Sequence, residues 1–151
     1  MLDRFSSCAA NALALARDEA RLLAHAYVGT EHLLIGLARE ERGAASRVLA
    51  SLDLTADQLR ESIVFIGGRG ESGPPSDDPP LTPRLERVLE AAEKEASRRQ
   101  QTQVATLHLL LALVREREGI AVMLLEVPGV ALERIGGAMM RALREGLADE
   151  A

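Results

Sequence analysis

The sequence predicts an all-α protein made of a duplicated four-helix repeat, about eight helices in all, whose halves are related by a pseudo-twofold axis. Composition is the first indication, because only 2% of the 151 residues are aromatic and the abundant Ala, Leu, Arg and Glu are strong helix formers. The second is an internal repeat. Residues 28–37, Val-Gly-Thr-Glu-His-Leu-Leu-Ile-Gly-Leu, return 76 positions later as residues 104–113, Val-Ala-Thr-Leu-His-Leu-Leu-Leu-Ala-Leu. Such a repeat predicts two similar helical units packed together.

The same offset divides the chain into regions. Residues 16–20 align with residues 92–96, and Phe5 aligns with Leu81. We therefore expect a single domain over residues 1–151, with repeat one at about 1–66 and repeat two at about 81–147. Residues 67–80 are rich in Gly, Pro, Ser and acidic residues. This composition buries little apolar surface and predicts an exposed, flexible linker.

Hydroxyl residues mark the predicted helix starts. The first helix of each repeat is expected to begin after Ser6 or Thr82, and Thr82-Pro83 combines an N-cap hydroxyl with proline at the first helical position. The second helix is expected to begin at Thr30 or Thr106. Apolar residues cover nearly its whole circumference, so we expect it in the middle of the domain.

The other two helices of each repeat are short and less strongly patterned. They are expected at residues 48–49 and from about 55 in repeat one, and at residues 122–125 and from about 131 in repeat two. Gly43 and Gly119 follow the second helices and are predicted to end them in a left-handed C-cap.

Charge and cysteine usage restrict the function classes. The net charge is −5 and the basic residues are dispersed, which argues against a nucleic-acid partner. No apolar run approaches the roughly 20 residues that span a bilayer, and the N-terminus does not have the pattern of a signal peptide, so no membrane partner is expected. Cys8 is the single cysteine, which excludes an intramolecular disulfide and fits a cytoplasmic protein.

The sequence offers no site for catalysis, a cofactor or a metal. A Walker motif needs a lysine beside the phosphates, and Lys94, the single lysine, lies within a predicted helix. Cys8 and His25 form the best nucleophile–base pair, but seventeen positions along one helix separate them by about 25 Å. His32 and His108 are repeat-equivalent and are interpreted as buried structural residues that hydrogen-bond near a helix start.

Four strings carry a resemblance to a known family. They are Phe-Ser at 5–6, Leu-Ala-Leu-Ala at 13–16, Tyr-Val-Gly-Thr-Glu-His-Leu-Leu-Ile-Gly-Leu at 27–37 and Leu-Thr-Pro-Arg at 81–84. With the duplication, they resemble the Clp N-terminal (Clp R) domain of the AAA+ unfoldases, most closely the ClpC type. The resemblance covers about residues 3–147.

The resemblance implies a non-catalytic docking module of the Clp chaperone–protease system. Its implied partners are adaptor proteins, unfolded or phosphoarginine-marked substrates, and a Clp ATPase or ClpP complex. An alternative is a stand-alone regulator that competes with the unfoldase for adaptors or braces the ClpP ring. The gene sequence downstream of Ala151 would separate the two hypotheses.

The resemblance also implies ligand-binding residues. A phosphoarginine pocket uses the hydroxyl residue that opens the first helix and the glutamate of the Thr-Glu-His string. Helix N-terminal N–H groups bind the phosphate and the carboxylate pairs with the guanidinium. The candidate pocket in repeat one is Ser6, Thr30 and Glu31. Its counterpart is Thr82, Thr106 and Leu107, interpreted as degenerate because leucine cannot pair with a guanidinium. The alternative is that Ser6 and Thr30 are ordinary N-caps and that Glu31 only favours the helix dipole.

Overall fold

The computed structural model describes residues 2–67, 77–116 and 132–150. These residues form seven α-helices and one short 3-10 helix and contain no β-strand, which confirms the all-α prediction. None of these helices is long and apolar enough to cross a bilayer. The elements in order are η1 (Leu2–Arg4), α1 (Ser7–Leu22), α2 (Thr30–Arg39), α3 (Ala44–Ser51), α4 (Ala56–Gly67), α5 (Pro83–Arg98), α6 (Thr106–Arg115) and α8 (Leu132–Arg144).

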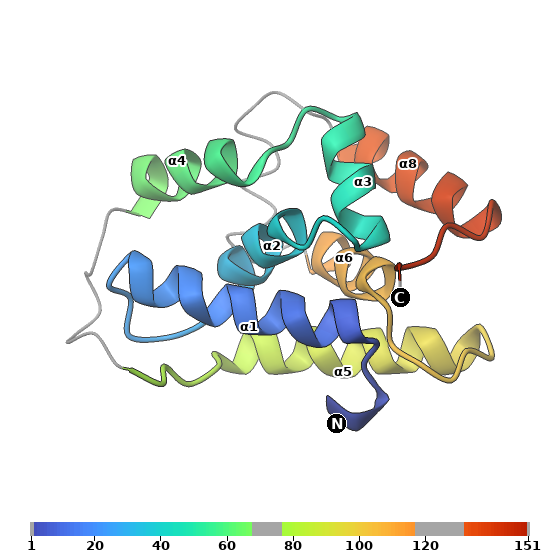
Figure 1. The fold of residues 1–151 in the computed structure, drawn as a ribbon, viewed down its shortest axis with the longest axis horizontal. Helices are drawn as coiled ribbons and strands as arrows, with labels where there is room; N and C mark the ends of the chain where they lie inside the picture. The colour runs from blue at the N-terminus through green and yellow to red at the C-terminus, as the bar shows by residue number, and fades with distance from the viewer. Residues whose placement is uncertain (1, 68–76, 117–131, 151) are drawn as a thin grey trace.

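The two helices α2 and α6 lie at the centre and contact each other, as their apolar composition predicts (Figure 1). Helix α1 packs on α2 and α5 packs on α6, while α3 contacts α2, α6 and α8. Leu33, Leu34 and Leu109 have no exposed surface. Gly36 brings α1 and α2 together closely, since a β-carbon there would collide with the backbone of Ala12.

Two isolated parallel bridges relate the repeats by pseudo-twofold symmetry. Phe5 of repeat one pairs with Val104 of repeat two, and Leu81 of repeat two pairs with Val28 of repeat one. Phe5 aligns with Leu81, and Val28 aligns with Val104. Replacing each residue of one bridge by its aligned residue in the other repeat therefore gives the second bridge. Each repeat therefore places the residue before its first helix against the residue before the other repeat's second helix.

Helix starts follow the predictions. Ser6 and Thr82 are N-caps whose hydroxyls accept hydrogen bonds from Ala9 N and Leu85 N, both at 3.1 Å. Helices α2 and α6 begin at Thr30 and Thr106.

The prediction that Gly43 forms a left-handed C-cap is wrong. Gly43 has φ −82° and is the N-cap of α3, because α2 has already ended at Arg39. The absence of a side chain at Gly43 allows Thr106 of the other repeat to approach closely. A β-carbon on residue 43 would stand 2.9 Å from Thr106 Cγ2. The predicted helix at 122–125 and Gly119 lie outside the described residues.

The predicted linker at 67–80 is described only at its ends. Gly67 is the last residue of α4, and residues 68–76 lie outside the described residues. At the other end Pro79 is buried, and Pro80 O accepts a hydrogen bond from Val28 N at 2.9 Å. The prediction was an exposed linker over the whole of 67–80. Residues 79–80 differ from it, because they are held against repeat one.

A buried glutamate ties together three helices of repeat one. Glu19 of α1 has no exposed surface. Its carboxylate accepts hydrogen bonds from Arg39 of α2 at 3.2 Å and from Arg60 of α4 at 2.9 Å and 2.5 Å. Two arginines thus compensate the cost of burying this charge.

Repeat two keeps a buried glutamate at this position with a different set of arginines. Glu95 aligns with Glu19 and accepts hydrogen bonds from Arg115 at 2.8 Å, Arg99 at 2.7 Å and Arg98 at 3.1 Å. Burial raises the pKa of Glu95, but the hydrogen bonds from Arg99 and Arg115 outweigh it and leave the pKa below its ordinary value. The position that aligns with Arg60 is Gly136, so α8 supplies no arginine to Glu95.

Candidate functional site

The N-termini of α2 and α6 are fixed by their histidines. His32 Nδ1 accepts a hydrogen bond from Gly29 N at 2.8 Å, and His108 Nδ1 accepts one from Ala105 N at 2.8 Å. The proton must then lie on Nε2, which donates to His25 Nδ1 at 2.7 Å in repeat one and to Gln101 Oε1 at 2.5 Å in repeat two. The interpretation of both histidines as structural residues is confirmed.

The bridges bring the first-helix N-caps to the opposite repeat. Ser6 N donates to Val104 O at 2.9 Å, and Thr82 N donates to Val28 O at 2.9 Å. Ser6 therefore lies beside the start of α6, and Thr82 lies beside the start of α2.

Two composite sites result, each made from both repeats. We call them the Ser6 site (Ser6, Thr106 and Leu107) and the Thr82 site (Thr82, Thr30 and Glu31). The prediction that Ser6 shares a pocket with Thr30 and Glu31 is wrong in its grouping. The sequence prediction joins residues of one repeat, whereas the bridges place the N-cap of each first helix beside the start of the other repeat's second helix.

Glu31 has an unusual environment at the start of α2. Its half-buried carboxylate lies over Gly29, so close that a β-carbon on residue 29 would overlap it. Burial raises the pKa of Glu31, while its own backbone N–H and the charges of His25 and Arg84 oppose the rise. Arg84 belongs to the first turn of α5, next to Thr82, so the Thr82 site contains both an acid and a base.

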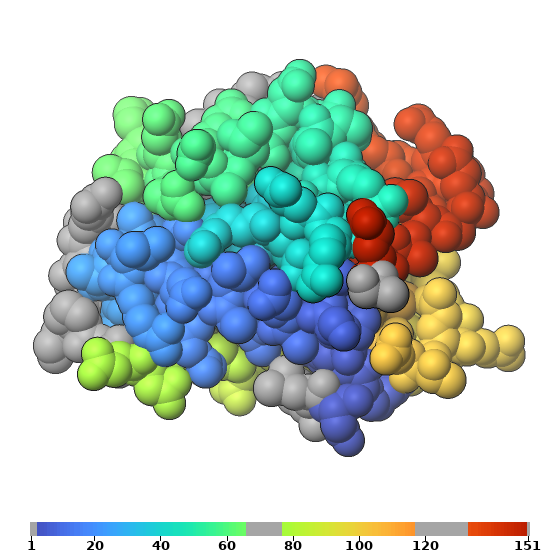
Figure 2. Space-filling view, in the orientation of Figure 1, coloured from blue at the N-terminus to red at the C-terminus, as the bar shows by residue number. Residues whose placement is uncertain are grey.

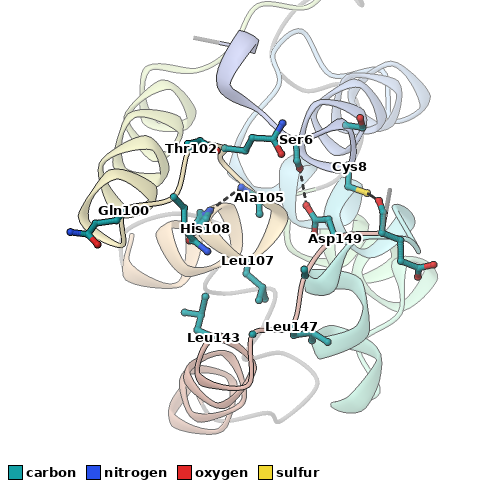
Figure 3. Close-up of a pocket in the computed structure, with 16 residues that line it drawn as sticks. Ser6, Cys8, Gln100, Thr102, Ala105, Leu107, His108, Leu143, Leu147 and Asp149 are labelled. Carbon is teal, nitrogen blue, oxygen red and sulfur yellow. Dashed lines mark hydrogen bonds between the residues drawn. The ribbon is translucent and has the colours of Figure 1, made fainter.

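The Ser6 site opens into a cavity of about 680 Å³. Figure 3 shows Ser6 and Asp149 pointing toward each other at its edge, and Leu107 pointing toward Leu143 and Leu147. Ser6 Oγ donates to Asp149 Oδ2 at 2.8 Å, and Thr106 Oγ1 donates to Asp149 Oδ1 at 2.6 Å. The place that Glu31 takes in the Thr82 site is thus apolar here, and a carboxylate from the C-terminal segment contacts the hydroxyls instead.

Metal binding has no support in the described part of the chain. No group of three or more His, Cys, Asp or Glu side chains there is arranged to hold an ion. The two histidines of the repeat use Nδ1 to accept a backbone hydrogen bond, and a ligating nitrogen would have to give that up.

The fold and the doubled helix start define a duplicated all-α domain with two composite sites, and the comparison with known families agrees with this class. The chain belongs to the Clp repeat (R) N-terminal domain family, whose model matches residues 4–127 and also 82–148. This confirms the resemblance drawn from the repeated strings.

Two curated relatives are named as ClpA and ClpC proteins. The chain is 40% identical over 145 residues to an ATP-dependent Clp protease ATP-binding subunit ClpA homolog of Porphyra purpurea, covering 96% of this chain and 18% of that protein. It is 37% identical over 143 residues to the negative regulator of genetic competence ClpC/MecB of Bacillus subtilis, covering 95% and 17%. The chain thus spans less than a fifth of the length of these relatives.

Solved structures share the fold. The N-terminal domain of the chaperone ClpD from Arabidopsis thaliana has a TM-score of 0.79 at 25% identity, covering 95% of this chain and 99% of that one. A ClpV N-domain in complex with a VipB peptide has a TM-score of 0.73 at 19% identity, covering 99% and 92%. At that lower identity the likeness concerns the fold alone.

Sequence reasoning missed two residues of these sites. Gly29 could have been found, because the repeats differ there (Gly29, Ala105) two positions before they differ at Glu31 and Leu107. Asp149 gave no signal, since it lies beyond the predicted end of repeat two.

Proposed function

We propose that this chain is a non-catalytic protein-binding module that docks adaptor proteins or marked substrates for a Clp ATPase or ClpP complex, in the cytoplasm. Family membership supports the role, since the curated relatives include Clp ATP-binding subunits and a ClpC chaperone. The ClpV N-domain with its VipB peptide supports peptide docking on this fold.

The Thr82 site is our candidate for the ligand pocket, and its substrate mark is phosphoarginine. The carrying observation is the asymmetry between the two composite sites: a carboxylate, Glu31, at one and an apolar side chain, Leu107, at the other. At the start of α5, the positive charge of Arg84 and the N-terminus of the helix favour a phosphate. Glu31 supplies the acceptor for the guanidinium.

The two ends of phosphoarginine fit this arrangement of charge. The anionic phosphoryl group would lie toward Thr82 and Arg84, and the guanidinium toward Glu31. A purely anionic residue would satisfy only the end at Thr82 and Arg84. We therefore expect phosphoarginine to bind and phosphoserine to bind much more weakly.

A calorimetric titration with free phosphoarginine tests the pocket. One binding site per chain is expected, lost in Glu31→Gln and weakened in Thr82→Val. Ser6→Ala is the matched control, since it alters the other N-cap and should leave the titration unchanged. Absence of heat in the unaltered protein, or loss of binding in Ser6→Ala but not in Glu31→Gln, would overturn the assignment of the pocket.

A further inference from the structure

The carboxylate of Asp149 joins the two repeats at the Ser6 site. Oδ2 accepts from Ser6 Oγ at 2.8 Å and from Thr106 N at 3.0 Å, while Oδ1 accepts from Thr106 Oγ1 at 2.6 Å and from Ala44 N at 2.9 Å. Ser6 and Ala44 belong to repeat one and Thr106 to repeat two. The N-termini of three helices, α1, α3 and α6, thus converge on this one anionic side chain, which is the charge that helix N-termini favour.

The backbone around Asp149 is also held. Glu150 N donates to Arg42 O at 2.8 Å, and Cys8 Sγ donates to Glu150 O at 3.3 Å. A guanidinium N–H of Arg47 donates to Ala148 O. Figure 2 shows the dark red atoms of the C-terminal segment lying against the teal atoms of the α2–α3 region. Residues of repeat one therefore hold the backbone on both sides of Asp149.

The turn after α8 directs the chain to this place. Gly146 has φ +72°, Gly146 N donates to Leu143 O at 3.2 Å, and Leu147 N donates to Ala142 O at 2.9 Å. This is a Schellman motif, which ends the helix and reverses the chain. Leu147 then packs partly buried against the core.

We propose that residues 147–150 are an intramolecular ligand that occupies and closes the Ser6 site. An apolar anchor, Leu147, is followed two residues later by the acid that the three helix N-termini bind. While this acidic segment is docked, no external anion can reach Ser6 Oγ, Thr106 N and Ala44 N. This closed site is the composite site that lacks a glutamate, and it is separate from the Thr82 site.

The reactivity of the Cys8 thiol reports whether residues 147–150 are docked. It is the single cysteine of the chain, it is only 1% exposed, and it lies beneath the Glu150 carbonyl. Burial, followed by the charge of Asp149, raises the pKa of the Cys8 thiol. Since the thiolate is the reactive form, a docked segment keeps Cys8 slow to react, and release of the segment exposes it.

The test measures the rate at which a thiol reagent labels Cys8 in the full chain. Asp149→Ala should label at least about tenfold faster than the unaltered protein, because local opening becomes frequent without global unfolding. Gly146→Ala should accelerate labelling to a smaller extent, since an L-residue is strained at positive φ. Glu150→Ala is the matched control: it removes the neighbouring acid but keeps the backbone contacts, so its rate should stay within about twofold.

Backbone amide resonances supply a second measurement that does not depend on the thiol. In Asp149→Ala, millimolar inorganic phosphate should shift the amide signals of Ala44 and Thr106, whereas in the unaltered protein it should not. Equal labelling rates in Asp149→Ala and the unaltered protein would overturn docking. Equal phosphate shifts in both, or none in Asp149→Ala, would overturn closure of an anion site. A circular dichroism spectrum and urea titration of each variant separate these results from general unfolding.

Discussion

The carboxylate of Glu31 lies over Gly29, in the space that a β-carbon on residue 29 would fill. Gly29 has φ −108°, a conformation that any residue adopts, and Ala105 takes the equivalent N-cap position with φ −98°. Glycine is therefore required here for space and not for backbone conformation. In repeat two, Ala105 takes the position of Gly29 and Leu107 takes the position of Glu31.

Gly29→Ala should displace the Glu31 carboxylate and weaken phosphoarginine binding at least about tenfold, because the guanidinium acceptor loses its position. The fold should change little, since the collision is with the end of a flexible side chain. A calorimetric titration measures the binding and a urea titration the stability. Ala105→Gly is the matched control in repeat two and should leave binding unchanged. Full binding by Gly29→Ala would contradict the role given to the Glu31 position.

The buried charge of Glu19 should contribute more to stability than its counterpart Glu95. Glu19→Gln leaves Arg39 and Arg60 without their acid, and breaking a buried pair costs about 3 kcal/mol. Glu95→Gln should cost less, about 2 kcal/mol, because two of its three arginine partners, Arg98 and Arg115, have side chains that are 69% and 55% exposed and can return to water, while only Arg99, at 31%, is as buried as the partners of Glu19. Urea unfolding of both variants measures the difference. A larger loss in Glu95→Gln than in Glu19→Gln would contradict this account.

The sequence predicts the helices and their starts because these are local properties. Ser6 and Thr82 cap their own helices, and the apolar circumference of α2 and α6 requires burial whatever surrounds them. The sequence could not predict which N-cap faces which second helix. That pairing depends on the bridges of Phe5 to Val104 and of Leu81 to Val28. The 76-residue offset shows which residues are equivalent, but it does not show which residues of the two repeats are in contact.

The same reasoning explains the missed contact of Asp149. Its four hydrogen bonds reach residues between 43 and 143 positions away, so no local pattern marks it. The C-cap prediction for Gly43 fails for a related reason. Its position after α2 fits that motif, but the close approach of Thr106 from the other repeat determines its role.

His25→Gln should be nearly neutral for stability, within about 0.5 kcal/mol. In repeat two Gln101 already takes the place of His25 and accepts the Nε2 hydrogen bond of the buried histidine. A glutamine at residue 25 can accept from His32 in the same way. His25→Ala is the comparison variant and should be destabilised by about 1 kcal/mol, since it leaves a buried donor without its acceptor. Equal stabilities of the two variants would contradict the importance of this hydrogen bond.

Stability should fall as the pH is lowered below about 6.5. Burial, with the charge of His25 as a second cause, lowers the pKa of His32 from 6.5 to about 3, and burial also lowers the pKa of His108. The folded protein therefore keeps His32 neutral down to about pH 3, whereas the unfolded chain binds a proton near pH 6.5. Between these values the unfolded state holds more protons, so stability is lost as pH falls, by up to about 1.4 kcal/mol per pH unit for each histidine.

Urea titrations between pH 7.5 and 5 measure this slope, above the range in which most carboxylates titrate. His32→Gln should be less stable at pH 7.5 but should show a shallower decline, because one of the two protons taken up on unfolding is gone. His25→Gln should keep the slope of the unaltered protein if His32 is the residue responsible. A free energy of unfolding that stays constant from pH 7 to pH 5 would show that the unfolded chain takes up no extra proton, and the neutral, buried state of His32 would then be disproved.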